Sequence, residues 1–202
     1  MWLLLQLCDS AFPAGGFPHS GGLEAATKLG DLPPRRFVED AIWQAAHGAL
    51  PLARAAHAGD AAAVDRVAEA SLVNHVARRA SRAQGRAFLH ACAHAFPVDI
   101  ALPHGHWAPA VGAVTAALGA SVDDAETLIL HSTVRGVLSA AVRLGRIGPL
   151  EAQGIQRELA PLLDAARAAG RAVALGDLAQ TAPLVDVYLA LHDQLYSRLF
   201  QS

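Results

Sequence analysis

The chain lacks several residue types and patterns, and each lack removes a class of protein. It has only two cysteines, Cys8 and Cys92, in 202 residues. That is too few for a disulfide framework, so we expect a reducing compartment and a cytoplasmic protein. No run approaches the roughly 18 apolar residues of a membrane-spanning helix. The apolar residues 1–8 have no basic segment before them and are interrupted by Gln6, which argues against a signal peptide.

A basic excess is also missing. Sixteen Lys and Arg residues stand against eighteen Asp and Glu residues, for a net charge of −2. Binding to nucleic acid without sequence preference needs a strong basic excess, so we expect neither nucleic acid nor a membrane as partner. Aromatic residues make up only 5% of the chain, although 53% is hydrophobic and much of that is alanine. Alanine favours helices, so the core is predicted to be closely packed helices.

No segment shows the two-residue alternation of a strand between hairpin turns, and helical periodicity runs almost throughout. The sequence therefore predicts an all-α fold, a single compact bundle of roughly eight to ten helices with no sheet, as one domain over residues 1–202. The pair Gly59-Asp60 is a helix start signal, and Ser121 with Asp124 forms a capping box before a helix that runs to about Arg143.

Prolines and glycines predict where other helices begin, bend and end. We expect a helix to open at Pro33-Pro34 and to be interrupted at Pro51. Another should open at Gly148-Pro149, kink at Pro161 and end at Gly170. Near the end of the chain, leucines and a tyrosine are spaced three or four residues apart from Leu184 to Leu199, which predicts one amphipathic helix over that range.

The segment Asp9–Glu24 has the most unusual composition of the chain. It holds four glycines, two prolines, two phenylalanines and one histidine in sixteen positions. Glycine opens backbone angles that other residues avoid and proline fixes φ, so the segment has a specified path rather than a floppy one. The residues expected to define this loop are Asp9, Ser10, Pro13, Gly15, Gly16, Phe17, His19, Ser20, Gly22 and Glu24.

Two familiar loop motifs do not fit this segment. No Gly-Lys-Ser/Thr follows the glycine pairs, and Pro18 stands where a nucleophile elbow needs glycine. Two interpretations stay open. One is a rigid surface loop that enters a helix near Gly21, and the other is a catalytic loop of a small helical enzyme, with His19 and Glu24 as acid–base groups. A pocket with perturbed titrating groups would distinguish the enzyme.

Histidines and arginines supply weaker candidates. His90 and His94 are four residues apart and share a helix face, while His104 and His106 flank a glycine. A closed zinc site needs four ligands with paired spacing, which is absent, so these four histidines are weak metal candidates and no stably bound cofactor is expected. Arg78, Arg82 and Arg86 form a stripe with Arg79 beside it, either a solvated face or a docking strip for carboxylates. The acidic run Asp123–Glu126 suits a helix start, and no catalytic nucleophile–base set can be assembled.

Five segments, in order and spread over nearly the whole chain, resemble the motifs of the UreF family of urease accessory proteins. They are the Asp9–Glu24 loop, Ser81–Arg86, Leu102–Gly112, Ser139–Leu144 followed by Gln153, and the tail Pro183–Ser202 with His192-Asp193 and Ser197-Arg198-Leu199-Phe200. The chain departs from the family pattern in three places. Asp193 stands for Glu, Gln201 replaces Arg, and residues 146–149 differ from the usual Pro-Leu-Gly-Gln run.

The resemblance implies an all-helical, non-catalytic chaperone for assembly of the dinuclear nickel centre of urease. Members of that family pair with a UreD subunit, also called UreH, recruit the nickel-carrying GTPase UreG and modulate its GTP hydrolysis on the urease apoprotein. They often form homodimers, and nickel is handled by the complex. The residues that we expect to bind partners are Arg82, Arg86, Arg143, Gln153, His192, Tyr196, Arg198, Leu199 and Phe200.

The sequence leaves the role of the tail and the mode of nickel handling open. Tyr196 to Phe200 either dock the UreD-type subunit or pack on the chain's own core. Reversal of Arg82 to glutamate is expected to weaken recruitment of UreG without unfolding the protein. A direct nickel-binding chaperone that uses the histidine pairs is the alternative function, since imidazole suits that ion.

Overall fold

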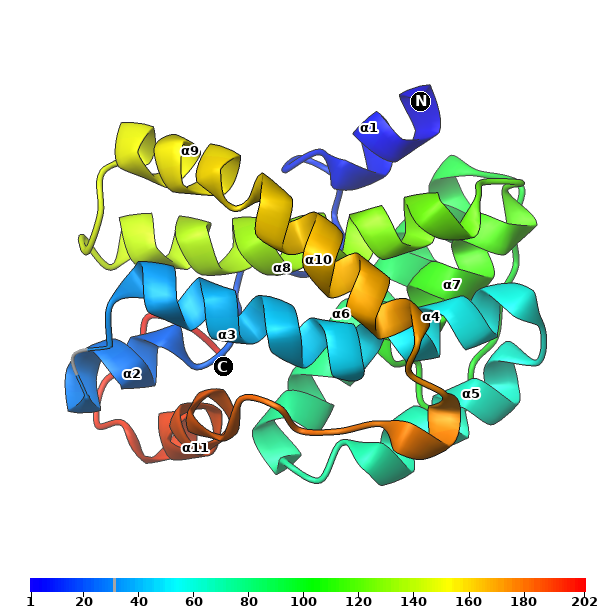
Figure 1. Ribbon diagram of the computed structural model, residues 1–202. Helices are drawn as coiled ribbons and strands as arrows, with labels where there is room; N and C mark the ends of the chain where they lie inside the picture. Colours follow the sequence, from blue (N-terminus) through cyan, green and yellow to red (C-terminus); the bar gives the residue numbers. More distant parts are fainter. Residues whose placement is uncertain (31) are drawn as a thin grey trace.

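The computed structural model describes residues 1–30 and 32–202 and shows helices joined by short connections (Figure 1). These residues form eleven α-helices and two short 3-10 helices, with no strand among them, which confirms the all-α prediction. The α-helices are α1 (Trp2–Cys8), α2 (Leu23–Leu29), α3 (Pro34–His47), α4 (Ala49–Ala58), α5 (Ala61–Ser71), α6 (His75–Ala95), α7 (Trp107–Ala117), α8 (Val122–Arg143), α9 (Pro149–Glu158), α10 (Ala160–Arg171) and α11 (Pro183–Leu191), and the 3-10 helices are η1 (Leu175–Asp177) and η2 (His192–Gln194).

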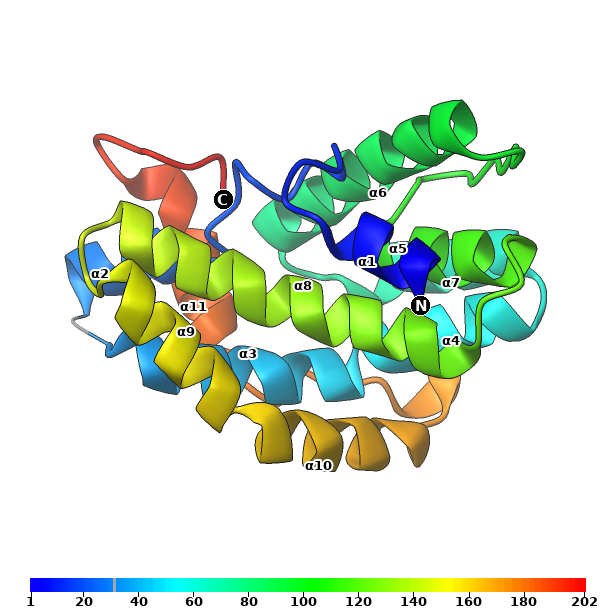
Figure 2. The ribbon, with the colours of Figure 1, turned by 90° about the horizontal axis from the view of Figure 1, so that it is seen from above.

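Helix α8 is the longest and runs through the middle of the molecule (Figure 2). Helices α3, α9 and α10 lie on one side of it, and α6 with the N-terminal loop and the C-terminal tail lies on the other. One continuous core connects these layers, and it includes Phe37, Ile42, Phe88 and Leu128, all fully buried. The segments from the two ends of the chain therefore meet over the same helix.

Close helix contacts follow from the small side chains. Helices α4 and α7 pack so closely that a Cβ at Gly112 would lie 2.9 Å from the backbone nitrogen of His57 and still nearer to the carbonyl oxygen of Ala53. Gly170 of α10 likewise faces the carbonyl oxygen of Ala46 on α3. The alanine-rich core thus packs backbone against backbone, as the composition predicts.

The predicted helix starts are confirmed at two caps. The Asp60 side chain accepts the N–H of Ala63 at 2.9 Å and opens α5. Ser121 and Asp124 cap each other's backbone N–H groups at the start of α8, and that helix ends at Arg143 as expected. Each cap satisfies donors that the first helical turn leaves unpaired.

The proline and glycine signals in the middle of two helical segments were misplaced. The break between α3 and α4 falls at Gly48, and Pro51 lies in the first turn of α4, where its missing N–H costs no helical bond. Pro161 does not kink one helix. It is the second residue of α10, and Leu159 separates α10 from α9. The predicted end at Gly170 is right to within one residue, since α10 ends at Arg171, and Gly170 lies at the contact with α3.

The predicted helix from Leu184 to Leu199 is wrong in its second half. Helix α11 ends at Leu191, and after η2 the chain is irregular. The core side of α11 holds Val185 and Leu189, while Leu184 and Leu199 are exposed. The tail leaves the helix because its backbone N–H groups bond to distant acceptors instead of to the preceding turn, a tertiary effect that periodicity does not register.

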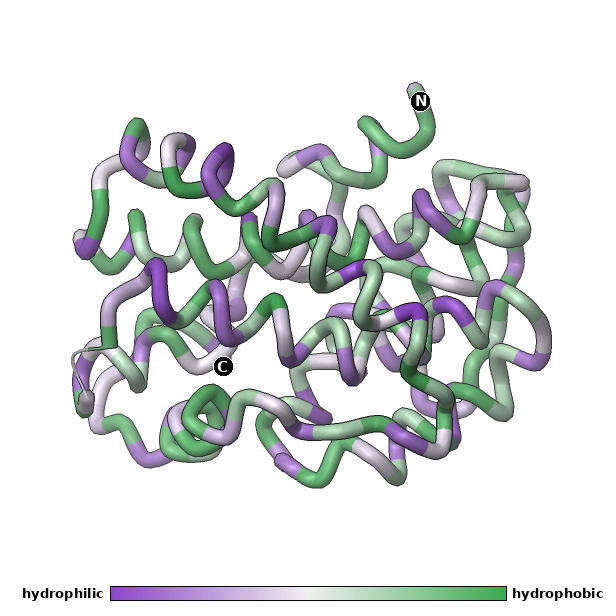
Figure 3. The backbone as a smooth tube through the Cα atoms, in the orientation of Figure 1, coloured by the Kyte–Doolittle hydropathy of each residue, from purple (hydrophilic) through white to green (hydrophobic). Residues whose placement is uncertain are grey.

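Hydrophobic and hydrophilic residues are interspersed along most helices, whereas α1 is apolar over most of its length (Figure 3). Leu7 of this helix is buried, but Trp2 and Leu5 are 79% and 56% exposed. Within the described part of the chain, no helix is both long and apolar enough to cross a membrane.

The contact between α4 and α7 gives a test of the packing. We expect Gly112→Ala to lower the free energy of unfolding by about 1–3 kcal/mol, because the added methyl group meets backbone atoms that have no room to move. Gly154 of α9 is the matched control, since a Cβ there meets nothing within 4 Å. Gly154→Ala should raise stability by up to about 1 kcal/mol. Urea denaturation measures both, and equal effects of the two variants would contradict the packing.

Candidate functional site

Two segments from opposite ends of the chain bind each other beside the end of α8. Gln201 N–H donates to the Pro18 carbonyl at 2.7 Å, and the Ser20 N–H and hydroxyl donate to the Ser202 carbonyl at 2.5 and 2.7 Å. The His19 ring bonds through Nδ1 to the Ser202 hydroxyl at 2.7 Å. We call residues 17–24 and 192–202 together the clasp.

The carboxylate of Glu24 is the centre of the clasp and is fully buried. Oε1 accepts from Lys28 Nζ at 2.9 Å and from the Leu199 N–H at 2.8 Å, and Oε2 accepts from the Phe200 N–H at 3.1 Å and bonds His192 Nε2 at 3.2 Å. Burial alone would raise the pKa of Glu24, but these four hydrogen bonds lower it below its usual value. The carboxylate is therefore charged and holds the tail by its main chain.

Arg143, the last residue of α8, joins the two halves of the clasp from the side. Its guanidinium carbon lies 4.0 Å from the centre of the Phe17 ring and 4.2 Å from that of Phe200. Its Nη1 donates to the Phe17 carbonyl at 2.6 Å. Cation–π contacts and a charged hydrogen bond thus tie the Ser139–Leu144 motif to both ends of the chain.

A second carboxylate, Asp193, attaches the clasp to α6. It accepts two hydrogen bonds from Arg79, at 2.7 and 3.1 Å, and contacts His75 Nε2 at 3.3 Å. Arg198 of the tail reaches the same carboxylate at 3.0 Å. The hydrogen bond from Arg79 is the main reason that the pKa of Asp193 is lowered. Asp193 therefore makes this connection even though the family pattern has glutamate there.

The loop that precedes the clasp has an exposed half and a buried half. Asp9, Ser10, Pro13, Gly16 and Phe17 face solvent, and His19, Ser20, Gly22 and Glu24 are buried.

Two glycines of the loop are required by their surroundings. Gly15 has φ of 71° and presses against α6, where an added Cβ would lie 2.9 Å from the Cβ of Ala87. Gly22 has φ of 94° and meets the backbone of Leu189. The loop is thus fixed in place by both α6 and α11, as its composition predicts.

A second polar cluster connects α5, α6 and α7. The fully buried Asp65 accepts the backbone N–H groups of His104, Gly105 and His106 at 2.6, 3.2 and 2.8 Å. His106 then bonds Glu69 through Nε2 at 2.9 Å and the Ser81 hydroxyl through Nδ1 at 3.1 Å. These contacts join the Ser81–Arg86 and Leu102–Gly112 motifs.

Within this cluster, the negative charge of Glu69 is paired with the positive charge of Arg82. Hydrogen bonding from Arg82, whose Nε lies 3.0 Å from the carboxylate, is the main cause that lowers the pKa of Glu69 to about 2. Burial lowers the pKa of His106, against the opposing effect of Glu69. Sequence reasoning missed Asp65 and Glu69. An acid within the apolar stripe at Val64, Asp65 and Ala68 was the signal that could have indicated a buried partner.

The order Ser81–His106–Glu69 matches that of a catalytic triad, but the surroundings do not suit nucleophilic catalysis. Ser81 lies inside α6, where backbone N–H groups are bonded within the helix and leave no donors for an oxyanion. Its hydroxyl already accepts the Trp107 N–H at 3.2 Å. The Arg82 guanidinium also neutralises the glutamate. The arrangement therefore locks three helices together.

The residues predicted to bind partners fall into two groups. Tyr196 and Leu199 are 107% and 55% exposed, and Gln153, Arg86 and Arg198 also face solvent. His192 and Phe200 are buried within the clasp. Arg82 and Arg143 are half-buried in contacts of the chain itself. Arg86 donates from Nε to the His104 carbonyl at 3.1 Å.

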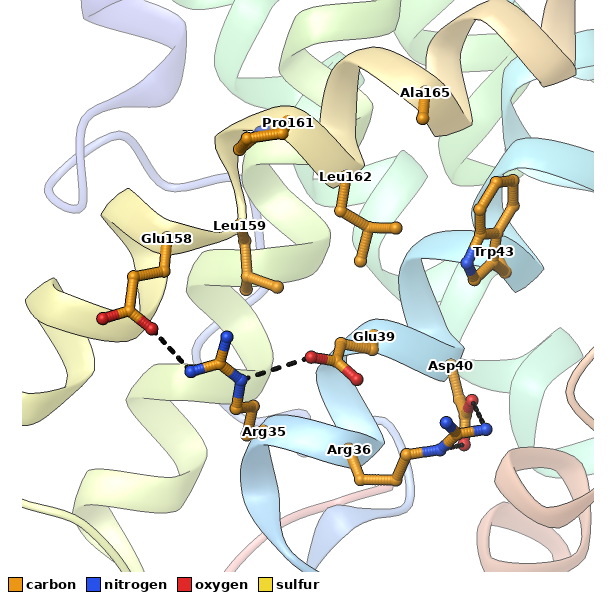
Figure 4. A pocket seen from close by; sticks show the side chains of 10 residues that line it. All are labelled: Arg35, Arg36, Glu39, Asp40, Trp43, Glu158, Leu159, Pro161, Leu162 and Ala165. Carbon is orange, nitrogen blue, oxygen red and sulfur yellow. Dashed lines mark hydrogen bonds and ion pairs between the residues drawn. The ribbon is translucent and has the colours of Figure 1, made fainter.

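Two pockets among the described residues have neither His19 nor Glu24 in their lining. One is a groove of about 530 Å³ between α3 and the α9–α10 junction, where Arg35 pairs with Glu39 and Glu158 at 3.3 and 2.5 Å (Figure 4). The other has about 370 Å³ and a mostly apolar lining, and lies between α3, α4, α5 and α7. The pKa values of His19 and Glu24 are both lowered, but both side chains are hydrogen-bonded to the C-terminal tail. This arrangement does not suit the acid–base pair of an enzyme.

Comparison with known proteins agrees with the arrangement of these motifs. The UreF family model matches residues 34–160. The chain is 33% identical to urease accessory protein F of Oryza sativa subsp. indica, over 99% of this chain and 84% of that protein. This chain belongs to the UreF family. It is also 34% identical to the Arabidopsis thaliana protein, over 100% of this chain and 92% of the relative, and 33% identical to UreF of Mycobacterium sp. (strain JLS), over 98% and 97%.

Replacement of the central carboxylate tests the clasp of this UreF-family chain. Glu24→Gln keeps the shape but loses the charge that four donors share, so we expect the free energy of unfolding to fall by about 2 kcal/mol or more. Tryptic cleavage after Arg198 should become faster. Glu158→Gln removes an exposed ion pair and should cost less than about 1 kcal/mol, with unchanged cleavage. A tail equally protected in Glu24→Gln would show that the carboxylate does not hold it.

The pH dependence of stability tests the buried His19. Burial is the main cause that lowers the pKa of His19 to about 4, with Arg79 and His192 adding to it. The unfolded chain therefore binds the extra proton first. The stabilisation is complete above a pH of about 6.5 and is lost as pH falls toward 4. Between pH 7 and pH 4.5 the free energy of unfolding should therefore fall by about 2 kcal/mol less in His19→Gln than in the wild type. Equal slopes in His19→Gln and the wild type would contradict the assignment.

Proposed function

We propose that this chain is a non-catalytic scaffold of urease maturation, which bridges a UreD-type subunit and the UreG GTPase and modulates GTP hydrolysis during nickel insertion. Membership of the UreF family supports a role in urease maturation, because its relatives are named urease accessory proteins. The urease apoprotein is then the target of the assembly, and a homodimer is the proposed state within it.

The observation that carries the proposal is the exposed rim of the clasp. Tyr196, Leu199 and Phe17 project large apolar side chains into solvent, at 107%, 55% and 73% exposure. They are mounted on main chain that Glu24 and Arg143 hold in place. Exposed aromatic side chains on a fixed backbone are typical of binding hot spots. We assign this rim to the UreD-type subunit, while Phe200 supports it from beneath.

The arginine stripe of α6 supports a more limited role in the recruitment of UreG. Arg78 and Arg82 pair with Glu69, and Arg79 pairs with Asp193. Reversal of Arg82 would leave Glu69 facing a second carboxylate, so it would also loosen the contact between α5 and α6, contrary to the expectation that the fold is untouched. Arg86 is the better probe of a carboxylate-rich partner, since its side chain is exposed.

For the alternative function, direct nickel binding, only the pair His90 and His94 remains a candidate. His106 is fully buried and both of its ring nitrogens are bonded, so the pair with His104 does not offer two free imidazoles. His90 and His94 are both exposed. A nickel-binding role would therefore rest on α6 rather than on the loop at residues 104–106.

The rim can be tested without disturbing the clasp. In Tyr196→Ala/Leu199→Ser the Leu199 N–H still reaches Glu24, so stability should change by less than about 0.5 kcal/mol. We expect the variant to lose co-elution with the UreD-type subunit on a sizing column, whereas the wild type forms a complex. Trp2→Ala/Leu5→Ser removes similarly exposed side chains from α1 and serves as the matched control. Undiminished co-elution of the rim variant would refute the assignment.

A further inference from the structure

His90 and His94 form an exposed pair near the end of α6. Their ring centres are 4.4 Å apart, with the ring planes inclined at 54°. Several other histidines of the described chain are bonded to distant segments, for example His57 to the Ala120 carbonyl and His192 to Glu24, and His47 bonds the Trp43 carbonyl of its own helix. The pair on α6 contacts only its own helix among the described residues.

The hydrogen bond within the pair fixes which nitrogen of His94 is free. His94 Nδ1 lies 2.9 Å from the carbonyl oxygen of His90. A carbonyl only accepts, so Nδ1 carries the proton and donates it. The lone pair of neutral His94 is therefore on Nε2, and the side chain is exposed. Metal-binding histidines commonly donate their other ring N–H to a backbone carbonyl in this way, which orients the ring.

We propose that His90 and His94 bind a divalent late first-row transition ion, such as Ni²⁺, Cu²⁺ or Zn²⁺, through two imidazole nitrogens. Two nitrogens that share one ion, each about 2.1 Å from it, are about 3 Å apart. Rings four residues apart on a helix reach that separation by small side-chain rotations. Imidazole ligands select these ions over Mg²⁺ and Ca²⁺, which take oxygen ligands.

The site has two protein ligands and is open. The intervening Cys92 is fully buried, and two residues along a helix its side chain points to a different face from the histidines, so its sulfur does not join the pair. Among the described residues no group of three or more His, Cys, Asp and Glu side chains could enclose an ion. Ala93 and Ala95 beside the pair are exposed and small. Water or a donor from another protein completes the coordination, so the ion is held weakly and exchanges readily.

Isothermal titration calorimetry of the isolated full chain with NiCl₂ tests the site independently of urease maturation. We expect saturable uptake of one ion, and at least tenfold weaker binding in His90→Ala and in His94→Ala. His104→Ala removes a histidine outside the pair and should bind as the wild type does. Circular dichroism verifies that each variant remains helical.

A relocated histidine provides the matched control for geometry. The double variant H94A/A95H keeps the number of imidazoles but moves the second one to five residues from His90, on a different face of the helix. We expect it to bind as weakly as His94→Ala. Wild-type affinity in this double variant, or in either single variant, would overturn the proposal, as would the absence of saturable binding by the wild type.

Discussion

The architecture of this UreF-family chain depends on one buried carboxylate. Glu24 has no exposed surface, and an unpaired charge in that position would be strongly destabilising. It is stabilised by the four donors around it, of which Leu199 and Phe200 contribute main-chain N–H groups. Because N–H groups donate whatever their side chain is, the carboxylate fixes the path of the tail and leaves its side chains available for other contacts.

The same arrangement occurs a second time in the fold. Asp65 is also fully buried, and it holds the segment before α7 through three consecutive N–H groups. In both places an acid on a helix fixes an irregular segment that has few apolar side chains of its own. Near each acid an arginine attaches a further helix, Arg143 through the Phe17 carbonyl and Arg82 through Glu69. A chain with 5% aromatic residues thus orders its loops by hydrogen bonds to buried acids more than by large side chains.

Local signals in the sequence predicted those helix starts that depend only on neighbouring residues. The capping box at Ser121 and the cap at Asp60 define helix starts by themselves, so both were found. The tail could not be found in this way. The leucine spacing from Leu184 to Leu199 fits a helix, yet the tail N–H groups bond to Glu24 and to Pro18, about 180 residues earlier in the chain. No periodicity in the tail carries that information.

The candidate site shows the same division. The composition of Asp9–Glu24 predicted a specified loop, but the tail that the loop bonds to was not visible from composition. Arg143 and Phe200 were singled out through the family resemblance, while their contact with Phe17 belongs to the folded chain. Arg82 shows the limit most clearly. A basic stripe indicates a surface for acidic partners, whereas here Glu69 of the same chain occupies this arginine.

These internal pairings restrict where a partner can gain binding energy. A charge already bonded to its own chain must give up that bond before it binds another protein, so most of the arginine stripe offers little net affinity. Tyr196 and Leu199 carry exposed uncharged side chains, so in the proposed complex they would bury apolar surface without breaking an ion pair. Their backbone is already ordered by Glu24, so association loses less conformational entropy than it would with a free tail. In the clasp, a buried carboxylate thus fixes the main chain on which these exposed apolar side chains are carried.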